Sequence, residues 1–467
     1  MEKLEQRIKV CITLEGSYPY ITGGVSAWIH DLIIGLKDID FILFTISPKE
    51  NQKIRYELPE NVIHHKDFVL GNFTHNRVKI SKKKIKELVN VLIKTFEEQK
   101  SLTTVLPYII NNSPVGYTPF KDFINSDEGW KIIIEYNKQK NPAYPFSEYF
   151  WAWKSSYDLL FSIVNEALPK ADIYHAVSTG FAGIAALCGK IRNAKPMILT
   201  EHGLYHKERE IEIRRASFVR GNQRDIWIEM YNDLSKICYS NADIITSLFE
   251  QNRQFQIDLG ADPDLSIVIP NGIDLKRFNV KREKKIGEFS IGLVGRVVPI
   301  KDIKTFIKTS HYLSTKIPEA HFYCIGPTDE DEHYFSECVN LVKSLHLEER
   351  FTFTGRTDVL EYYKFLDVLL LTSIREAQPL VILEAWVVGI VVIATKVGNI
   401  PEMLDYNEKL LASSKDYIGL GESVLYVYHN SDLVKDIINK NRYKVEAFFN
   451  KEKLHMKYLN LYKDLGV

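Results

Sequence analysis

Residues 368–394 read VLLLTSIREAQPLVILEAWVVGIVVIA, two short apolar runs separated by a helical pattern. The runs Val368–Leu371 and Ile390–Ala394 are too short to be helices and are apolar on both faces. This pattern is typical of parallel strands that are covered by helices on both sides of a sheet. A strand, a helix and a parallel strand in succession form a right-handed βαβ unit. The stretch therefore predicts an α/β fold built on a parallel sheet.

Similar apolar runs recur along the chain and form two sets, one in each half. Because each set alternates with helical patterns, the sequence predicts two doubly wound, Rossmann-like domains. The further predicted strands are Lys9–Leu14, Asp40–Ile46, Asp172–Val177, Met197–Thr200 and Asp243–Thr246 in the first set, and Ser290–Val294, His321–Ile325 and Phe351–Thr354 in the second.

Turn residues mark the boundary between the two sets. The segment Ile269–Asp274 reads IPNGID, and the polar stretch that follows has no periodicity. We place the linker at about 273–288, with an N-terminal domain at 1–272 and a C-terminal domain at 289–446. A C-terminal helix at about 447–467 is expected to pack back on the first domain.

One segment, at about 70–165, does not follow the alternation of strands and helices. It contains a lysine-rich helical pattern (Ser81–Lys100) and an aromatic-rich part (Tyr144–Tyr157). These patterns predict a mostly helical insertion in the first domain. The lysine run Ser81–Lys86 could contact anionic lipid or a partner, but a solvated helix face is the favoured interpretation.

The composition is that of an ordinary globular protein. The chain has 467 residues, of which 45% are hydrophobic and 26% are charged. Its 60 Lys and Arg residues balance its 60 Asp and Glu residues. A general nucleic-acid binder normally carries a basic excess, so no nucleic-acid partner is expected.

The cysteines and the apolar runs both favour a cytoplasmic protein. The five cysteines form no CxxC pair, which is typical of reduced, buried thiols. The charged N-terminal residues contain no apolar signal region. The longest apolar stretch, Leu380–Ala394, is interrupted by Glu384 and is shorter than the ~20 residues that span a bilayer.

Two motifs could bind an anion at the ends of predicted strands. Gly23 and Gly24 follow the first strand, where a glycine backbone and the N-terminus of a helix can approach a phosphate. A plain tight turn is the alternative. Arg296 and Lys301 follow the first strand of the second domain and could together neutralise a diphosphate. Two surface cations beside a turn are the alternative.

Two carboxylates and a histidine complete the candidate site. Glu376 follows a strand, and Glu384 lies eight positions later in an apolar helix, where it needs a partner such as ribose hydroxyls or a structural salt bridge. His202, in the sequence Glu201-His202-Gly203, could contact a sugar or move a proton, or be structural. Metal binding by His202 and His206 lacks an evident third ligand, so no metal site is expected.

Together these motifs resemble those of family-4 glycosyltransferases with the GT-B fold, in which two Rossmann-like domains face a cleft. The resemblance is carried by Gly23-Gly24, by Glu201-His202-Gly203, by Gly295-Arg296 with Lys301, and by the E-x7-E motif from Glu376 to Glu384. A narrower resemblance, to the glycosyltransferases of Pel exopolysaccharide synthesis in biofilms, spans nearly the whole chain. It is carried by residues 11–33, 200–209, 326–338 and 372–385.

The resemblance implies a retaining, metal-independent transferase that needs no cofactor. It would move a sugar from UDP-glucose or a UDP-hexosamine to a growing saccharide. The implied protein is cytoplasmic and peripheral to the inner membrane through a membrane-bound polysaccharide synthase complex, with cyclic-di-GMP control through a partner. Three alternatives stay open: a lipid-linked or small acceptor, a catalytically silent nucleotide-sugar-binding scaffold, and a nucleotide-sugar epimerase of the same fold.

The resemblance implies that the domain at 1–272 is the acceptor-side domain and that the domain at 289–446 binds the nucleotide sugar. Within them, roles carry over from this family position by position. Arg296 and Lys301 would hold the diphosphate, Glu384 the ribose, and Glu376 the donor sugar. His202 would lie near the reacting carbon. The remaining implied donor contacts are Gly23 and Gly24 at the phosphate, Gly355 and Arg356 beside the base, and Leu380 and Val381 at the start of the E-x7-E helix.

Overall fold

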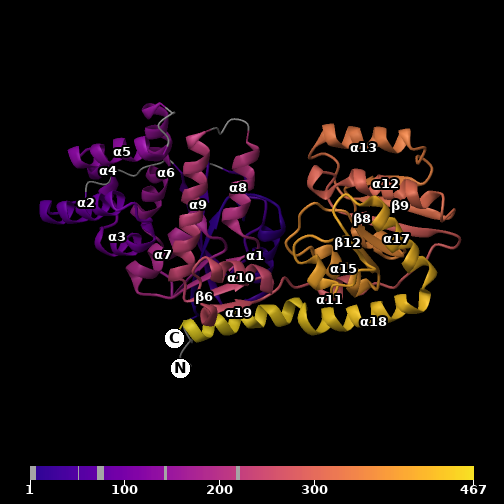
Figure 1. Ribbon diagram of the computed structural model, residues 1–467. Coiled ribbons are helices and arrows are strands. Elements are labelled where there is room, and N and C mark those ends of the chain that lie inside the picture. The colour runs from indigo at the N-terminus through magenta and orange to yellow at the C-terminus, as the bar shows by residue number, and fades with distance from the viewer. Residues whose placement is uncertain (1–6, 51, 71–77, 141–144, 217–220, 467) are drawn as a thin grey trace, which may run out of the picture. The chain divides into compact units, whose positions relative to one another are not determined.

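The computed structural model describes residues 7–50, 52–70, 78–140, 145–216 and 221–466 (Figure 1). The chain divides into two compact units: Met1–Ile269 with His455–Val467, and Pro270–Leu454. Each unit is built on its own parallel β-sheet. The predicted α/β fold with two Rossmann-like domains is therefore confirmed.

The sheet of the first unit has seven strands in the order β3-β2-β1-β4-β5-β6-β7. The order reverses between β1 and β4, and such sheets bind ligands beside the carboxyl ends of the strands at this switch point. The strands are β1 (Lys9–Glu15), β2 (Asp40–Ser47), β3 (Val62–Val69), β4 (Ile173–Ala176), β5 (Met197–Glu201), β6 (Ile244–Ser247) and β7 (Ser266–Val268).

The two edge strands of this sheet, β3 and β7, are absent from the predicted set. β3 reads VIHHKDFV, and its Asp67 accepts hydrogen bonds from the hydroxyls of Thr45 and Ser47 at 2.5 and 2.6 Å. An edge strand has a neighbour on one side only and tolerates charged residues. Its sequence therefore lacks the continuous apolar run by which buried parallel strands are recognised.

Helices cover this sheet and form the segment between β3 and β4. The covering helices are α1 (Gly24–Gly35), α7 (Gly180–Asn193), α8 (Tyr205–Arg215), α9 (Asn222–Asn241) and α10 (Glu250–Asp258). The segment between β3 and β4 contains α2 (Lys82–Glu97), a 3-10 turn (Leu102–Thr104), α3 (Leu106–Asn112), α4 (Pro119–Ile124), α5 (Asp127–Lys140) and α6 (Phe146–Asn165).

The end of the last helix, α19 (Lys451–Leu465), belongs to the first unit. Its Tyr462 hydroxyl lies 2.7 Å from Nδ1 of His175, and Nε2 of His175 lies 2.8 Å from the Thr200 hydroxyl. The hydroxyl of Tyr458 reaches Thr246 at 3.1 Å. Burial lowers the pKa of His175 to about 3, so its ring is neutral at physiological pH. A buried, paired network of this kind fixes one position for the helix on the sheet.

The sheet of the second unit has the order β10-β9-β8-β11-β12-β13, with its switch point between β8 and β11. Its strands are β8 (Phe289–Val294), β9 (Ala320–Ile325), β10 (Phe351–Gly355), β11 (Val368–Leu371), β12 (Val391–Thr395) and β13 (Leu411–Ala412). Its helices are α11 (Leu275–Phe278), α12 (Ile303–Ser314), α13 (Glu332–Ser344), α14 (Val359–Tyr363), α15 (Leu380–Val388), α16 (Ile400–Met403), α17 (Tyr417–His429) and α18 (Ser431–Phe448).

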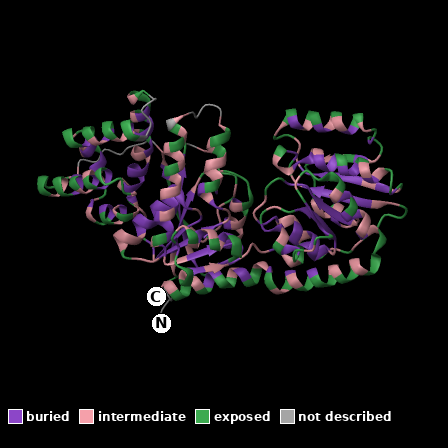
Figure 2. Cartoon of the chain, viewed as in Figure 1, coloured by how far each residue is buried: buried purple, intermediate pink, exposed green. Residues whose placement is uncertain are grey.

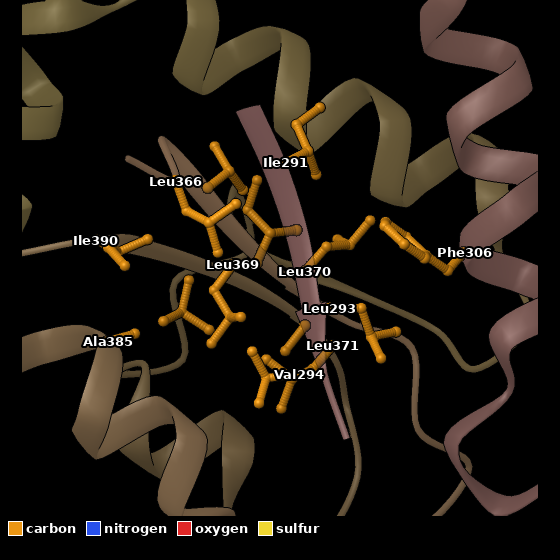
Figure 3. Packing of buried hydrophobic residues seen from close by; sticks show 14 of the residues in the cluster. Ile291, Leu293, Val294, Phe306, Leu366, Leu369, Leu370, Leu371, Ala385 and Ile390 are labelled. Carbon is orange, nitrogen blue, oxygen red and sulfur yellow. The ribbon is translucent and has the colours of Figure 1, made fainter. Parts of the chain in front are cut away.

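Side chains from both faces of this sheet are buried. Figure 3 shows the side chains of β8 and β11 packed with Phe306 of α12 on one side and Ala385 of α15 on the other. Burial follows the strands, whereas the helices keep an exposed face (Figure 2). This distribution is why the central strands are apolar throughout.

The predicted linker, at about 273–288, is packed within the second unit. It begins with a bridge between Ile273 and Asn450 and contains α11. The amide of Glu283 donates to the carbonyl of Lys364 at 2.7 Å, and Lys285 lies 4.0 Å from the centre of the Phe365 ring. The methylene groups of Lys285 cover apolar surface. A search for periodic apolar residues does not detect packing by lysine side chains.

Across the residues that the structure describes, no helix is both long enough and apolar enough to span a membrane.

Candidate functional site

The second unit brings Lys301 and Glu376 into contact at the carboxyl ends of β8 and β11. Nζ of Lys301 lies 2.5 Å from Oε1 of Glu376, and the Ser373 hydroxyl donates to the same oxygen at 2.7 Å. The Lys301 side chain is 21% exposed and that of Glu376 is 12% exposed. Partly buried charges are screened by salt much less than surface charges. The attraction between Lys301 and Glu376 at the switch point therefore persists at moderate salt concentration.

The backbone around Lys301 is held by the end of β11 and by a helix cap. The hydroxyl of Thr372 donates to the carbonyl of Lys301 at 2.8 Å. Lys301 ends the 3-10 turn Pro299–Lys301, and Asp302 follows with a φ of 48° and caps α12 through the amide of Thr305. Lys301 thus directly precedes the N-cap of a helix, whose N-terminus carries partial positive charge. Both features favour an anion here.

The loop after β12 lies directly against the backbone of Glu376. Gly398 has a φ of +54°, and a Cβ at this residue would lie 1.8 Å from the Glu376 carbonyl oxygen. The amide of Asn399 donates to the carbonyl of Ala377 at 3.0 Å, and the hydroxyl of Thr395 donates to the backbone carbonyl of Ser373 at 2.6 Å. Only glycine permits so close an approach in the left-handed region. The loop therefore sets the position of the Glu376 turn.

Three amide side chains at this turn hold buried polar atoms that lack a hydrogen-bond partner among the described residues. These atoms are Nε2 of Gln378, Oδ1 of Asn399 and Oδ1 of Asn271. Gln378 is 6% exposed, and its Oε1 accepts from the Asn271 amide at 2.7 Å. Leaving a buried polar atom unpaired costs about 1–3 kcal/mol. The cluster is therefore a place for water or ligand atoms, and the sequence motifs did not identify it.

Arg296 and Arg356 both pair with an acidic loop that follows β9. Nη1 of Arg296 lies 2.5 Å from Oε1 of Glu330, and Nη2 of Arg356 lies 4.0 Å from Oδ2 of Asp329. The Arg296 side chain is 54% exposed and that of Arg356 is 80% exposed. Gly355, with a φ of +66°, makes the turn before Arg356. An anion that approached Nη1 of Arg296 would therefore compete with the Glu330 carboxylate.

Glu384 has a tyrosine as its partner. Its Oε2 accepts a hydrogen bond from the hydroxyl of Tyr363 at 2.7 Å. Burial raises the pKa of Glu384, whereas the Tyr363 hydrogen bond and the charge of Arg277 lower it. Leu380 and Val381 form the first turn of the same helix, α15, and are half-buried. The alternative interpretation, a structural salt bridge, is not what the described residues form: Glu384 has a hydroxyl hydrogen bond and a more distant cation.

Gly23 and Gly24 lie exposed where the loop after β1 enters α1. Gly23 has an extended backbone that any residue can adopt, and a Cβ on either glycine would meet no atom within 4 Å. The fold of the unit therefore does not require glycine here. The absence of side chains leaves the first amides of α1 open to an approaching group.

His202 lies directly after β5 in the same unit. Its ring packs edge-on against Trp28 of α1, with ring centres 4.6 Å apart, and Trp28 also contacts Tyr458 at 5.3 Å. His206, one turn further along, is buried, and burial lowers its pKa to about 4. Within the described ranges, no group of three or more His, Cys, Asp or Glu side chains is arranged to hold a metal ion.

Two carboxylates, the buried Glu201 and the half-buried Glu15, position the segment that carries His202. Oε1 of Glu201 accepts from the amide of Tyr205 at 3.2 Å, and its Oε2 accepts from the hydroxyl of Tyr239 at 2.6 Å. Glu15, at the end of β1, accepts from the Tyr205 hydroxyl at 2.6 Å and from the Phe181 amide at 3.1 Å. Burial raises the pKa of both carboxyl groups. An acid beside a glycine at a strand end, Glu15-Gly16, is the signal that could have identified Glu15.

The structure thus joins some of the predicted residues and separates others. Lys301 and Glu376 are in contact, whereas Arg296 and Arg356 meet the same acidic loop. Glu384 binds Tyr363. Gly23, Gly24 and His202 lie at carboxyl ends of strands in the first unit.

Two family models match the chain, one in each half. Residues 8–264 match a domain of unknown function (DUF3492), and residues 276–444 match glycosyl transferases group 1. The first match covers more than half of the chain, and the second contains Arg296, Lys301 and the segment from Glu376 to Glu384.

Similar proteins include two curated bacterial enzymes. N-acetyl-alpha-D-glucosaminyl L-malate synthase of Bacillus anthracis is 29% identical over 168 residues, which cover 36% of this chain but only 43% of that enzyme. UDP-Gal:alpha-D-GlcNAc-diphosphoundecaprenol alpha-1,3-galactosyltransferase of Escherichia coli is 26% identical over 318 residues, 64% of this chain and 76% of that enzyme.

Solved structures with a similar fold cover nearly the whole chain. The UDP complex of Anabaena HepE has a TM-score of 0.63 at 14% identity and covers 98% of this chain and all of its own. Sucrose-phosphate synthase from Thermosynechococcus elongatus has a TM-score of 0.61 at 17% identity, covering 98% of this chain and 99% of its own. At such identities the similarity establishes the two-domain fold.

Proposed function

Because the chain belongs to the DUF3492 family and its second half belongs to glycosyl transferases group 1, we propose that it transfers a sugar from a UDP-sugar to a saccharide. The configuration at the transferred carbon is retained. The donor is UDP-glucose or a UDP-hexosamine.

One observation carries the proposal: the contact between Lys301 and Glu376 at the β8–β11 switch point. A cation and a carboxylate at this point provide partners for the two parts of a nucleotide sugar. The ammonium group attracts the diphosphate, and the carboxylate accepts hydrogen bonds from sugar hydroxyls. When the donor binds, the diphosphate competes for Lys301 and releases Glu376 to the sugar.

The leaving group of the reaction is the UDP diphosphate, on which negative charge develops. Arg296 and Lys301, with the nearby N-terminus of α12, stabilise that charge in the transition state. Arg296 exchanges the Glu330 carboxylate for the phosphate. Its planar guanidinium group can donate two parallel hydrogen bonds to phosphate oxygens. The departing phosphate oxygen then accepts the proton of the acceptor hydroxyl on the same face of the sugar. These steps assign no role to a metal or a cofactor.

The rest of the donor is held by residues around α15. Glu384 accepts from a ribose hydroxyl while it keeps Tyr363 on its other side. Leu380 and Val381 offer the free amides of the first helical turn. Gly355 and Arg356 flank the base. In the first unit, the amides at Gly23 and Gly24 approach the phosphate, and His202 contacts the sugar near its reacting carbon.

The proposed physiological setting is exopolysaccharide synthesis of the Pel type, as in the glycosyltransferase PelF. The resemblance of residues 11–33 and 326–338 to the Pel glycosyltransferases supports this assignment. The acceptor is a growing polysaccharide. The enzyme is cytoplasmic and is recruited to the inner membrane by a membrane-bound synthase complex.

A donor screen tests the proposal. UDP-, ADP- and GDP-sugars are added to the full chain, and melting temperature and nucleotide release are followed. We expect stabilisation and turnover with a UDP-sugar, since a ligand at 100 times its Kd adds about 2.7 kcal/mol to the folded state. NMR of the product reports the anomeric configuration. A response to ADP- or GDP-sugars alone, or an inverted product, would contradict the assignment.

A further inference from the structure

A pocket in the first unit lies outside every residue assigned above. Its volume is about 310 Å³, and it is lined by residues of α6, α9 and the end of α2. The helices α6 and α9 lie side by side (Figure 1). We call it the α6–α9 pocket. Facing helices normally interdigitate and leave few voids larger than a water molecule. A pocket at the lower end of the size range of ligand sites therefore needs an explanation.

One wall of the α6–α9 pocket is aromatic. Tyr149, Trp153 and Tyr157 recur every fourth residue and so lie on one face of α6. The ring of Trp153 lies 4.7 Å from that of Tyr157, and Phe96 of α2 lies 5.5 Å from Tyr157. Tyr149 is 3% exposed and Trp153 is 6% exposed, so the rings are held rigidly. The wall is an apolar surface of rings tilted against one another, with hydroxyl groups along it.

The hydroxyls of Tyr149 and Tyr157 make no hydrogen bond to another described residue, although both side chains line the pocket. The pKa of each is raised, first by burial and then by neighbouring charges that include Glu229. Other buried tyrosines in this unit, such as Tyr239, do have a hydrogen-bond acceptor. A sheltered hydroxyl normally has a partner. These two therefore offer hydrogen bonds to whatever fills the pocket.

The opposite wall, from α9, is polar and carries both signs of charge. Its carboxylates are Glu229 and Asp233, and the ammonium groups at the pocket are Lys236 and Lys100. Lys100 also pairs with Glu98, which does not line the pocket. Carboxylates disfavour an anion and ammonium groups disfavour a cation. The pocket thus favours a neutral ligand with many hydrogen-bonding groups.

We propose that the α6–α9 pocket binds an uncharged saccharide unit. The C–H face of a pyranose packs against the half-buried ring of Tyr157, since ring faces carry partial negative charge. The hydroxyls of the sugar reach Tyr149, Glu229 and Asp233, which supply donors and acceptors. The site is independent of the donor residues, so it would hold a sugar residue of a saccharide chain rather than the nucleotide.

The test uses the full chain with methyl glycosides of glucose, galactose, N-acetylglucosamine and N-acetylgalactosamine, with UDP in excess. Binding is followed by saturation-transfer NMR, and hydrogen exchange maps it. We expect at least one glycoside to bind with a Kd of about 1–10 mM and to slow exchange in residues 146–165 and 222–241. The double variant Tyr149→Phe/Tyr157→Phe should weaken binding at least tenfold, because it removes two hydroxyls and keeps the rings.

The matched control is Tyr108→Phe, which removes a hydroxyl from α3 outside the pocket and should leave binding unchanged. The proposal is overturned if no glycoside protects the two helices, if the double variant binds as tightly as the natural chain, or if only methylammonium or inorganic phosphate protects them. Turnover of UDP-sugar is measured separately, so a failure here is distinguishable from a failure of the proposed transferase activity.

Discussion

Lys301 and Glu376 form an ion pair at the candidate anion site of a protein with no net charge. Each neutralises the other when no ligand is bound, so neither charge is left unpaired in a sheltered place. Ser373 adds a hydrogen bond to the same carboxylate oxygen. In the proposed mechanism, the two side chains separate when a nucleotide sugar binds.

Replacing Lys301 by alanine should abolish most of the activity. Loss of one charge-stabilising group of this kind lowers kcat by about 10²- to 10³-fold. Steady-state release of UDP measures the effect. The control is Lys304→Ala on α12, which removes an exposed ammonium group that pairs with Glu337 at 2.8 Å. A surface pair contributes about 0–1 kcal/mol, so this variant should keep its turnover. Equal losses in both variants would contradict the role of Lys301.

Glu384 should make the stability of the protein depend on pH. Its pKa is raised in the folded state, so the folded chain binds more protons than the unfolded chain between the two values. The contribution is fully present below the ordinary pKa of glutamate and is lost as the pH rises through the raised value.

The measurement compares Glu384→Gln with the natural chain by urea unfolding between about pH 4 and pH 8. Glutamine keeps an oxygen for the Tyr363 hydroxyl and cannot ionise. The stability of the variant relative to the natural chain should therefore rise with pH, by about 1.4 kcal/mol for each unit of pKa difference. A difference that is constant over this range would show that Glu384 ionises as easily in the folded state as in the unfolded chain.

At the scale of elements, loops rather than strands decide how the donor residues are placed. The loop at Gly398 packs closely against the carbonyl of Glu376, and the acidic loop after β9 pairs with Arg296. Both contacts join segments that are distant in sequence. The E-x7-E spacing identified the carboxylates but contains no information about these neighbours.

Gly398→Ala should therefore reduce activity much more than an alanine at another glycine with a positive φ. Its Cβ would have to displace the turn that carries Glu376, and a shift of about 1 Å can lower a rate 100-fold. The measurement is kcat/KM for the UDP-sugar. Gly287→Ala is the matched control, because it has a φ of +74° and nothing within 4 Å of the new Cβ. Both variants share a conformational penalty of about 1 kcal/mol, so equal activities would contradict the displacement.

For the helical segment between β3 and β4, the sequence predicts the helices but not the pocket that they line. Its aromatic residues identify a packed helical region, and helices over this range are what the structure contains. That Tyr149, Trp153 and Tyr157 line a pocket with α9 depends on a packing that no local pattern records.

At the scale of the whole molecule, 60 basic and 60 acidic residues leave no net charge. At the β8–β11 switch point the balance is local as well, because Lys301 pairs with Glu376 and Arg296 pairs with Glu330. In the proposed mechanism, a small anionic donor takes over these two cations.

Because the proposed mechanism uses Arg296 and Lys301 in place of a metal, a chelator should not change the rate. The chain is dialysed against EDTA and UDP release is measured before and after Mg²⁺ or Mn²⁺ is added. We expect the same kcat throughout. Loss of turnover that a divalent cation restores would show that a metal, and not the two side chains alone, neutralises the diphosphate.

The sequence by itself determined the fold class, the buried central strands and most of the candidate donor residues. Central parallel strands are apolar on both faces, and charged residues at their ends are therefore conspicuous. Only the tertiary structure revealed the edge strand β3, the packing of 273–288, the partners of Arg296 and Glu384, and the α6–α9 pocket. These features depend on contacts between residues far apart in the chain. Such contacts arise only when the sheet and its loops have come together, and a local pattern of residues carries no record of them.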